Sequence, residues 1–169
     1  MEPLIALVLV TLVLHAAGAA GVGRLKPWVV PLRIGLAVMF TMTGLAHFVG
    51  MRQELIDMVP PSLPAPGLLV TVTGVLELVG AAALLRARSA PWSAAALSAF
   101  LVAVFPANVY AAQQGLGSST ADSLGYRTAI QVVFLAATLT VAVHHLRARR
   151  AAQHVPTTAP APGQLVSAS

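Results

Sequence analysis

The sequence predicts an all-α, polytopic membrane helix bundle. Of its 169 residues, 57% are hydrophobic and 9% are charged, whereas a soluble domain carries about 25% charged residues. The apolar residues fall into five runs, each close to the roughly 20 residues that an α-helix needs to cross a bilayer. The chain contains no cysteine, which excludes thiol–disulfide exchange, iron–sulfur clusters and cysteine metal sites within it.

The five spans are expected within a bundle of residues 1–150, at about 4–22, 28–50, 67–86, 90–113 and 126–146. The first begins Met-Glu-Pro, without the positive start of a signal peptide, although residues 16–21 are small, as at a cleavage site. Arg24 and Lys26 follow directly, which favours a retained span. Residues 151–169 are rich in Ala, Pro, Thr and Ser, so we expect a disordered cytoplasmic tail.

The charges between the spans predict the orientation. One face holds seven basic residues and no acid: Arg24, Lys26, Arg86, Arg88, Arg147, Arg149 and Arg150. The other face holds Arg52 with the acids Glu2, Glu54, Asp57 and Asp122. Lys and Arg concentrate on the cytoplasmic side, so we expect the N-terminus outside and the C-terminus inside. The net charge of +5 is then a topology signal, and no nucleic-acid partner is expected.

The segment 51–66, MRQELIDMVPPSLPAP, links the second and third spans. Its first half suits one or two turns of interfacial helix, and its four prolines then require an extended path. We expect it to lie over the outer ends of these two spans.

Six polar side chains lie at membrane depth, where such groups are rare and usually functional: Arg33, His47, Glu77, Asn108, Arg127 and Gln131. At a rise of 1.5 Å per residue, an outer layer contains His47, Asn108, Arg127 and Gln131. Glu77 lies about 15 Å deep, near the midplane. Small residues flank Glu77 and His47 at helical spacing, so neighbouring helices can approach closely. The sequence therefore predicts a ligand pocket that opens outward, with Glu77 at its floor.

Each of these residues also has a structural explanation. Arg33 can extend to the inner interface or form an ion pair with Glu77. His47 can hydrogen-bond a carbonyl or water, and Asn108 and Gln131 can hold helices together. Glu77 is the hardest to explain in this way, because a carboxyl group at this depth must be protonated, paired or hydrated.

Residues 43–50 (TGLAHFVG) resemble residues 73–80 (TGVLELVG), in helices that run in opposite directions. Such an echo can mark an inverted repeat around a midplane site, or arise by chance in a sequence so rich in Gly, Ala, Leu and Val. Pro106 is expected to kink the fourth span and free the carbonyl of Val102, which with Asn108 would face the pocket.

No catalytic residue and no metal site are expected. The sequence contains no nucleophile–base pair, phosphate loop or paired carboxylates. His47, Met51 and Met58 would suit a soft ion such as Cu(I), but methionine is also an ordinary membrane residue.

Several short motifs occur in order along the chain. They are Arg33-Ile-Gly-Leu, Phe40, Gly44, His47-Phe48, Met58-Val-Pro60, Gly74-x-x-Glu77-x-x-Gly80, Phe105-Pro-Ala-Asn108 and Arg127-x-x-x-Gln131. This set, over about 33–140, resembles the DoxX-like family of small bacterial membrane proteins. The resemblance implies a four-helix bundle in the bacterial inner (plasma) membrane, to which the first span adds an N-terminal helix. Members of that family are associated with quinone-linked redox enzymes and oxidative-stress complexes.

The resemblance implies an accessory subunit without catalytic activity of its own, with a membrane or redox protein partner or a second copy of itself. Its pocket would take a small ligand such as a quinone headgroup, held by His47, Glu77, Asn108, Arg127 and Gln131. Two alternatives stay open. One is a small-molecule or proton-coupled transporter, and the other is a purely structural assembly factor.

Overall fold

The computed structural model describes residues 2–116 and 123–153. In them the chain forms α1 Glu2–Ala19, the short 3-10 helix η1 Gly23–Leu25, α2 Val29–Ala46, α3 Arg52–Asp57, α4 Pro66–Leu84, α5 Ala90–Gln113 and α6 Leu124–Gln153. The five long helices α1, α2, α4, α5 and α6 are each long and apolar enough to cross a membrane. The predicted all-α polytopic bundle is therefore confirmed. The helix α6 continues into the segment predicted to be a disordered tail, and residues 154–169 of that segment lie outside the described residues.

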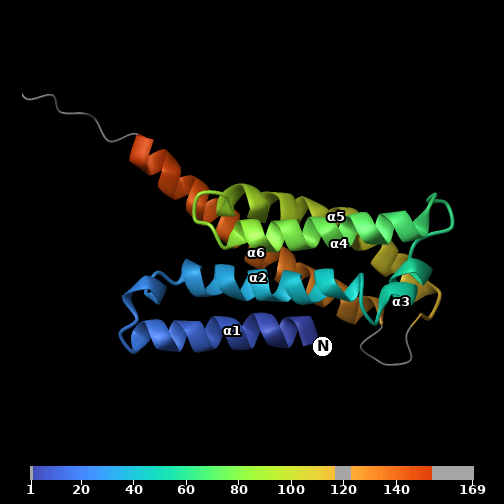
Figure 1. The fold of residues 1–169 in the computed structure, drawn as a ribbon, viewed down its shortest axis with the longest axis horizontal. Helices are drawn as coiled ribbons and strands as arrows, with labels where there is room; N and C mark the ends of the chain where they lie inside the picture. Colours follow the sequence, from blue (N-terminus) through green and yellow to red (C-terminus); the bar gives the residue numbers. More distant parts are fainter. Residues whose placement is uncertain (1, 117–122, 154–169) are drawn as a thin grey trace, which may run out of the picture.

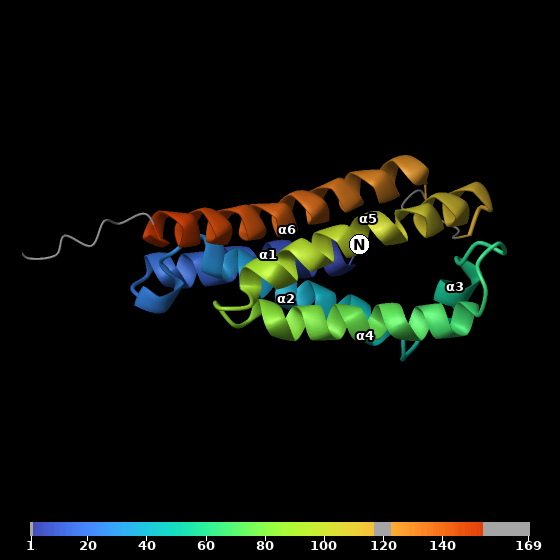
Figure 2. The same ribbon diagram turned by 90° about the horizontal axis from the view of Figure 1, so that it is seen from above.

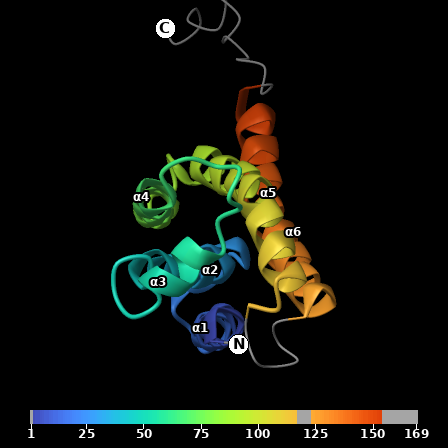
Figure 3. The same cartoon turned by 90° about the vertical axis from the view of Figure 1, so that its right-hand side faces the viewer.

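Helices α2, α4, α5 and α6 form a ring, and α1 lies outside it. α4 packs between α2 and α5, α5 packs along α6, and α6 returns to α2. α1 lies against α2 on the side away from α4 (Figures 1 and 3). Only Leu7 and Gly18 of α1 are buried, so most of its surface faces the bilayer. The close approach depends on Gly35 of α2, where a side chain would strike the Thr11 hydroxyl and the Leu7 carbonyl.

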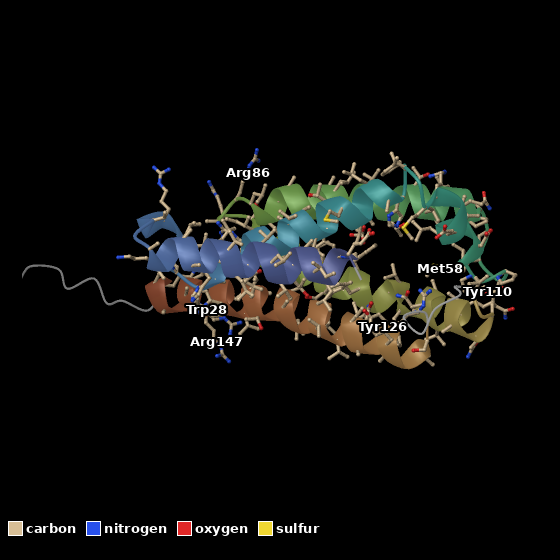
Figure 4. The ribbon with its side chains drawn as sticks, turned by 90° about the horizontal axis from the view of Figure 1, so that it is seen from below. Trp28, Met58, Arg86, Tyr110, Tyr126 and Arg147 are labelled. Atoms are coloured by element: carbon tan, nitrogen blue, oxygen red, sulfur yellow. The ribbon has the colours of Figure 1, made fainter. Side chains whose placement is uncertain are left out.

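The two ends of the bundle are formed by different segments, and the segments of the predicted basic face lie together at one of them. Figure 1 places η1, the α4–α5 connection and the last turns of α6 at one end, which we call the basic end. The start of α1, α3, the last turns of α5 and the first turns of α6 lie at the other end, the α3 end (Figures 1 and 2). Figure 4 shows Trp28, Arg86 and Arg147 toward the basic end and Met58 and Tyr110 toward the α3 end.

The hydrophobic core lies mainly in the half of the bundle nearer the basic end. Leu36, Phe40, Leu84 and Val141 are each 1% exposed or less. In α5 the buried residues run from Ala90 to Leu101, followed only by Ala111, and the first buried residue of α6 is Phe134. Packing between the pair α2–α4 and the pair α5–α6 is therefore looser toward the α3 end.

Hydroxyl groups close the ring between the apolar layers. Ser93 Oγ donates to the Gly80 carbonyl at 2.7 Å and joins α5 to α4. Ser98 Oγ donates to Thr138 Oγ1 at 2.8 Å and joins α5 to α6, with both residues buried. Such bonds between small polar side chains hold membrane helices together where lipid offers no competing partner.

The short helix α3 lies in the first half of the segment 51–66, where we predicted an interfacial helix. Arg52 attaches it to both neighbouring spans. Its guanidinium donates to the carbonyl of His47 at 3.1 Å, to the carbonyl of Gly67 at 3.1 Å and to Thr71 Oγ1 at 3.0 Å. One side chain thus joins the end of α2 to the start of α4.

We expect Arg52→Gln to release α3 while leaving the bundle folded. Loss of the charged donor removes hydrogen bonds worth about 1.5–3 kcal/mol each when fully formed, so local opening should become at least about tenfold more frequent. Hydrogen–deuterium exchange of residues 52–67 in nanodiscs measures this effect. Arg24→Gln is the matched control, since Arg24 is exposed in η1 at the basic end. Equal exchange in the wild type and Arg52→Gln would show that Arg52 does not hold α3.

Candidate functional site

The interface between α2 and α4 contains an acid–histidine pair. His47 caps the end of α2, and Glu77 lies within α4, only 7% exposed. His47 Nδ1 lies 3.7 Å from Glu77 Oε2 and 2.9 Å from the carbonyl of Thr43. A carbonyl oxygen only accepts, so Nδ1 carries a proton and donates it to Thr43. In the neutral ring Nε2 is then the acceptor.

Two glycines bring the helices close enough for this pair to form. A Cβ at Gly74 would lie 2.6 Å from the Cβ of His47 and 2.9 Å from Phe48. A Cβ at Gly44 would lie 2.9 Å from Leu78 and 3.2 Å from the Cβ of Glu77. Each glycine thus accommodates the polar residue of the opposite helix and the residue that follows it. The two similar segments 43–50 and 73–80 pack on each other in an antiparallel, locally symmetric way.

One oxygen of Glu77 is left without a hydrogen bond. Oε2 is buried and has no hydrogen-bond partner among the described residues, and 3.7 Å to His47 is too long for one. The Thr43 side chain also interacts with the carboxyl group. A buried polar atom left unsatisfied costs roughly 1–3 kcal/mol, so Oε2 is available to a donor from a ligand.

A second polar cluster joins α5 to α6. Arg127 donates to Asn108 Oδ1 at 3.4 Å and to the Leu116 carbonyl at 3.3 Å. Gln131 Nε2 donates to the carbonyl of Leu101. We expected Pro106 to free the carbonyl of Val102. The carbonyl that accepts from the Gln131 amide is instead that of Leu101, one residue before Val102. Neighbouring side chains commonly satisfy backbone groups near a membrane proline in this way.

The predicted site residues thus form two clusters on facing helix pairs. His47 and Glu77 belong to α2–α4, and Asn108, Arg127 and Gln131 belong to α5–α6. Two surface grooves lie at the basic end, beside His144 and Arg88 respectively, and therefore away from these clusters. An outward pocket between the clusters stays a prediction.

Arg33 is separate from both clusters. It is 8% exposed and lies within electrostatic reach of His145 on α6. In the part of the chain that the structure describes, the ion pair of Glu77 is with His47, and none joins it to Arg33. Depth along the helices placed Arg33 and Glu77 within reach of each other, but the carboxyl group lies beside the histidine of the neighbouring helix.

Two contributions were not recognised from the sequence. Arg52 was predicted only as an outer-face charge in the connecting segment 51–66, yet its guanidinium donates to the carbonyl of His47. Ser98 and Thr138 were not singled out, although they form a buried link between α5 and α6. A hydroxyl residue among small residues in an apolar helix is the only sequence signal for the second contribution, and it is common in membrane proteins.

Comparison with known protein families gives one assignment. A family model matches residues 36–142, which is more than half of the chain. The chain belongs to the DUF8561 family. This family is described as a domain of unknown function. The DUF8561 match begins in α2 and ends in α6, so it covers most of the four-helix ring and leaves α1 outside. It includes both polar clusters but not Arg33. No curated protein and no solved structure matches this DUF8561 protein.

Proposed function

We propose that this DUF8561 protein is an accessory subunit of a membrane redox or oxidative-stress system that binds a small ligand such as a quinone headgroup. The ligand would enter from the α3 end, between α2–α4 and α5–α6. The observation that carries this proposal is the buried Oε2 of Glu77, which lies beside His47 and has no hydrogen-bond partner within residues 2–116 and 123–153.

The chemistry of the clusters suits a quinone or quinol. Oε2 of Glu77 would accept a hydrogen bond from a quinol hydroxyl, and Glu77 would give or take the proton when the ligand changes redox state. His47 would hydrogen-bond the headgroup. On the facing helices, Arg127 and Asn108 supply donors for a quinone carbonyl. Gln131 has already committed Nε2 to Leu101, so its Oε1 is the atom left for a ligand.

The resemblance to the DoxX-like family supports the redox assignment. The ordered motifs include His47-Phe48, Gly74-x-x-Glu77 and Arg127-x-x-x-Gln131, and these contain the residues of both clusters. Since the DUF8561 description assigns no activity, the redox role is carried over from that resemblance alone. A subunit of this size would act with a membrane or redox protein, or with a second copy of itself.

The distribution of charge supports an orientation in the bacterial inner membrane. Seven Lys and Arg residues lie in the segments at the basic end, and basic residues concentrate on the cytoplasmic side. The N-terminus and the α3 end would then face outside and the C-terminus the cytoplasm. In this orientation the proposed site opens away from the cytoplasm.

We expect a short-chain benzoquinone or naphthoquinone to raise the melting temperature of the purified protein in nanodiscs, because a ligand that binds only the folded state stabilises it. The shift should disappear in Glu77→Gln and in His47→Ala. Glu54→Gln is the matched control, since Glu54 lies exposed on α3. An equal shift in the wild type and in both site variants would exclude these residues from the binding site.

A proton-coupled transporter is the second candidate, and the His47–Glu77 pair favours it. Two titratable groups 3.7 Å apart at membrane depth are the kind of relay that proton-coupled carriers use. The transporter hypothesis predicts substrate or proton flux into proteoliposomes that is lost in Glu77→Gln. Flux that is absent, or unchanged in the variant, would argue against it.

A further inference from the structure

A positively charged groove lies at the basic end, apart from the proposed ligand site. It runs between the α4–α5 connection and the last turns of α6, and it is lined by Arg86, Arg88, Ser89, Trp92 and Arg149. Three guanidinium groups from segments about 60 residues apart in the chain thus meet at one place. None of these residues takes part in the contacts of His47 or Glu77.

The groove is a built feature of the fold. Arg149 donates through Nη2 to the carbonyl of Arg88, which ties α6 to the α4–α5 connection. Ser89 Oγ donates to the carbonyl of Ala83 at 2.7 Å and fixes the turn. Trp92, in the first turn of α5, is 64% exposed at the edge of the groove. A guanidinium has five N–H donors, and the bond to Arg88 uses only one nitrogen of Arg149.

Among the residues that the structure describes, no acidic side chain lies at this groove. The five acids of the chain are Glu2, Glu54, Asp57, Glu77 and Asp122, and none lies in the segments of the basic end. The buried guanidinium of Arg33 extends this positive charge into the bundle. His145 lies within electrostatic reach of both Arg149 and Arg33, and His145 Nε2 and Arg33 Nε are buried without a hydrogen-bond partner among the described residues. Buried charge of one sign is costly unless a counter-charge approaches.

The ligand that fits is a phosphate monoanion at the membrane surface. Paired arginines match the oxygens of a phosphate through parallel N–H bonds. An exposed tryptophan at the end of a membrane helix lies at the level of the lipid headgroups, and basic pockets between membrane helices bind anionic headgroups. We propose that this groove binds the phosphate of an anionic phospholipid from the leaflet at the basic end.

The test uses the full-length protein and lipids of stated charge. Protein purified in mild detergent is mixed with phosphatidylglycerol or phosphatidylcholine, and retained lipid is counted by native mass spectrometry. Wild-type protein should retain phosphatidylglycerol in preference to phosphatidylcholine. The double variant Arg88→Gln/Arg149→Gln removes two guanidinium groups, and it should bind phosphatidylglycerol at least about tenfold more weakly, since the loss of even one charge-assisted contact corresponds to that change.

The double variant Arg24→Gln/Lys26→Gln is the control, because it removes two charges from the same end outside the groove. It should bind phosphatidylglycerol within about twofold of the wild type. The variant Arg88→Lys/Arg149→Lys keeps the charge and loses the guanidinium geometry, so its affinity should be intermediate. Equal loss in both Gln variants would overturn the proposal in favour of a general surface field. Displacement of the lipid by an equal concentration of inorganic phosphate would overturn it in favour of a soluble anion. Melting temperatures confirm that each variant is folded.

Discussion

Replacing Gly74 with alanine is expected to destabilise the bundle by about 1–3 kcal/mol, the usual cost of overpacking a close interface. The added Cβ would lie 2.6 Å from the Cβ of His47, an atom next to the backbone that cannot move aside without shifting α2. Gly74→Leu should separate α2 from α4 altogether, and the peak of folded protein should be lost on size-exclusion chromatography. The apparent melting temperature in detergent measures the effect of the alanine variant.

The reciprocal change and a neutral glycine make this prediction specific. Gly44→Ala should also destabilise, because its Cβ would lie 2.9 Å from Leu78. Gly125→Ala in α6 should be neutral or slightly stabilising, because nothing lies within 4 Å of its added Cβ and alanine favours a helix over glycine by roughly 1 kcal/mol. Three equal melting temperatures would mean that α2 and α4 do not pack through these glycines.

Replacing Glu77 with leucine is expected to leave the unfolding free energy unchanged or to raise it by about 1–3 kcal/mol. Glu77 is 7% exposed, and its Oε2 has no hydrogen-bond partner in the described residues. His47 keeps its hydrogen bond to the carbonyl of Thr43 in this variant and is not left without a partner, so removing a buried acid with an unsatisfied oxygen should be neutral or stabilising. Binding of the quinone probe should be lost in the same variant, as expected where a site costs stability.

This pairing of results separates a ligand site from a purely structural role. If the acid of Glu77 only holds α4 to α2, its removal should lower the melting temperature and leave any ligand-dependent readout intact. Thermal unfolding and probe binding measured on the same Glu77→Leu preparation distinguish the two cases. A large loss of stability with unchanged binding would support the assembly factor.

The spans could be predicted from the sequence because bilayer thickness limits their length and composition. Hydropathy alone separates five apolar runs, and the loop charges separate the two ends. The rotation of each helix about its own axis is harder to predict from the sequence. Depth along a helix follows from a rise of 1.5 Å per residue, which placed Glu77 near the midplane and His47 in the outer layer. Depth does not say which neighbour a side chain faces. Arg33 was the ion-pair partner that we considered for Glu77, whereas the ion pair in the structure is with His47.

The glycines of the two similar segments carried more information than the polar residues did. From the sequence, 43–50 and 73–80 were either an inverted repeat or a coincidence of composition. In the structure Gly44 faces Glu77 and Leu78, and Gly74 faces His47 and Phe48. The hydrogen bonds of Arg52 could not be predicted from the sequence, because a connection of irregular backbone has no periodicity from which to place its side chains.

The most direct test of the proposed site is to identify what the protein carries in its own membrane. The wild type and Glu77→Gln are extracted with native lipid, and small molecules that co-purify are compared by mass spectrometry, with Glu54→Gln as control. The proposal predicts a quinone or another small redox-active molecule enriched in the wild type and the control and depleted at least about tenfold in Glu77→Gln, as for loss of one hydrogen bond to a charged group. The same small molecules at the same abundance in all three preparations would contradict it.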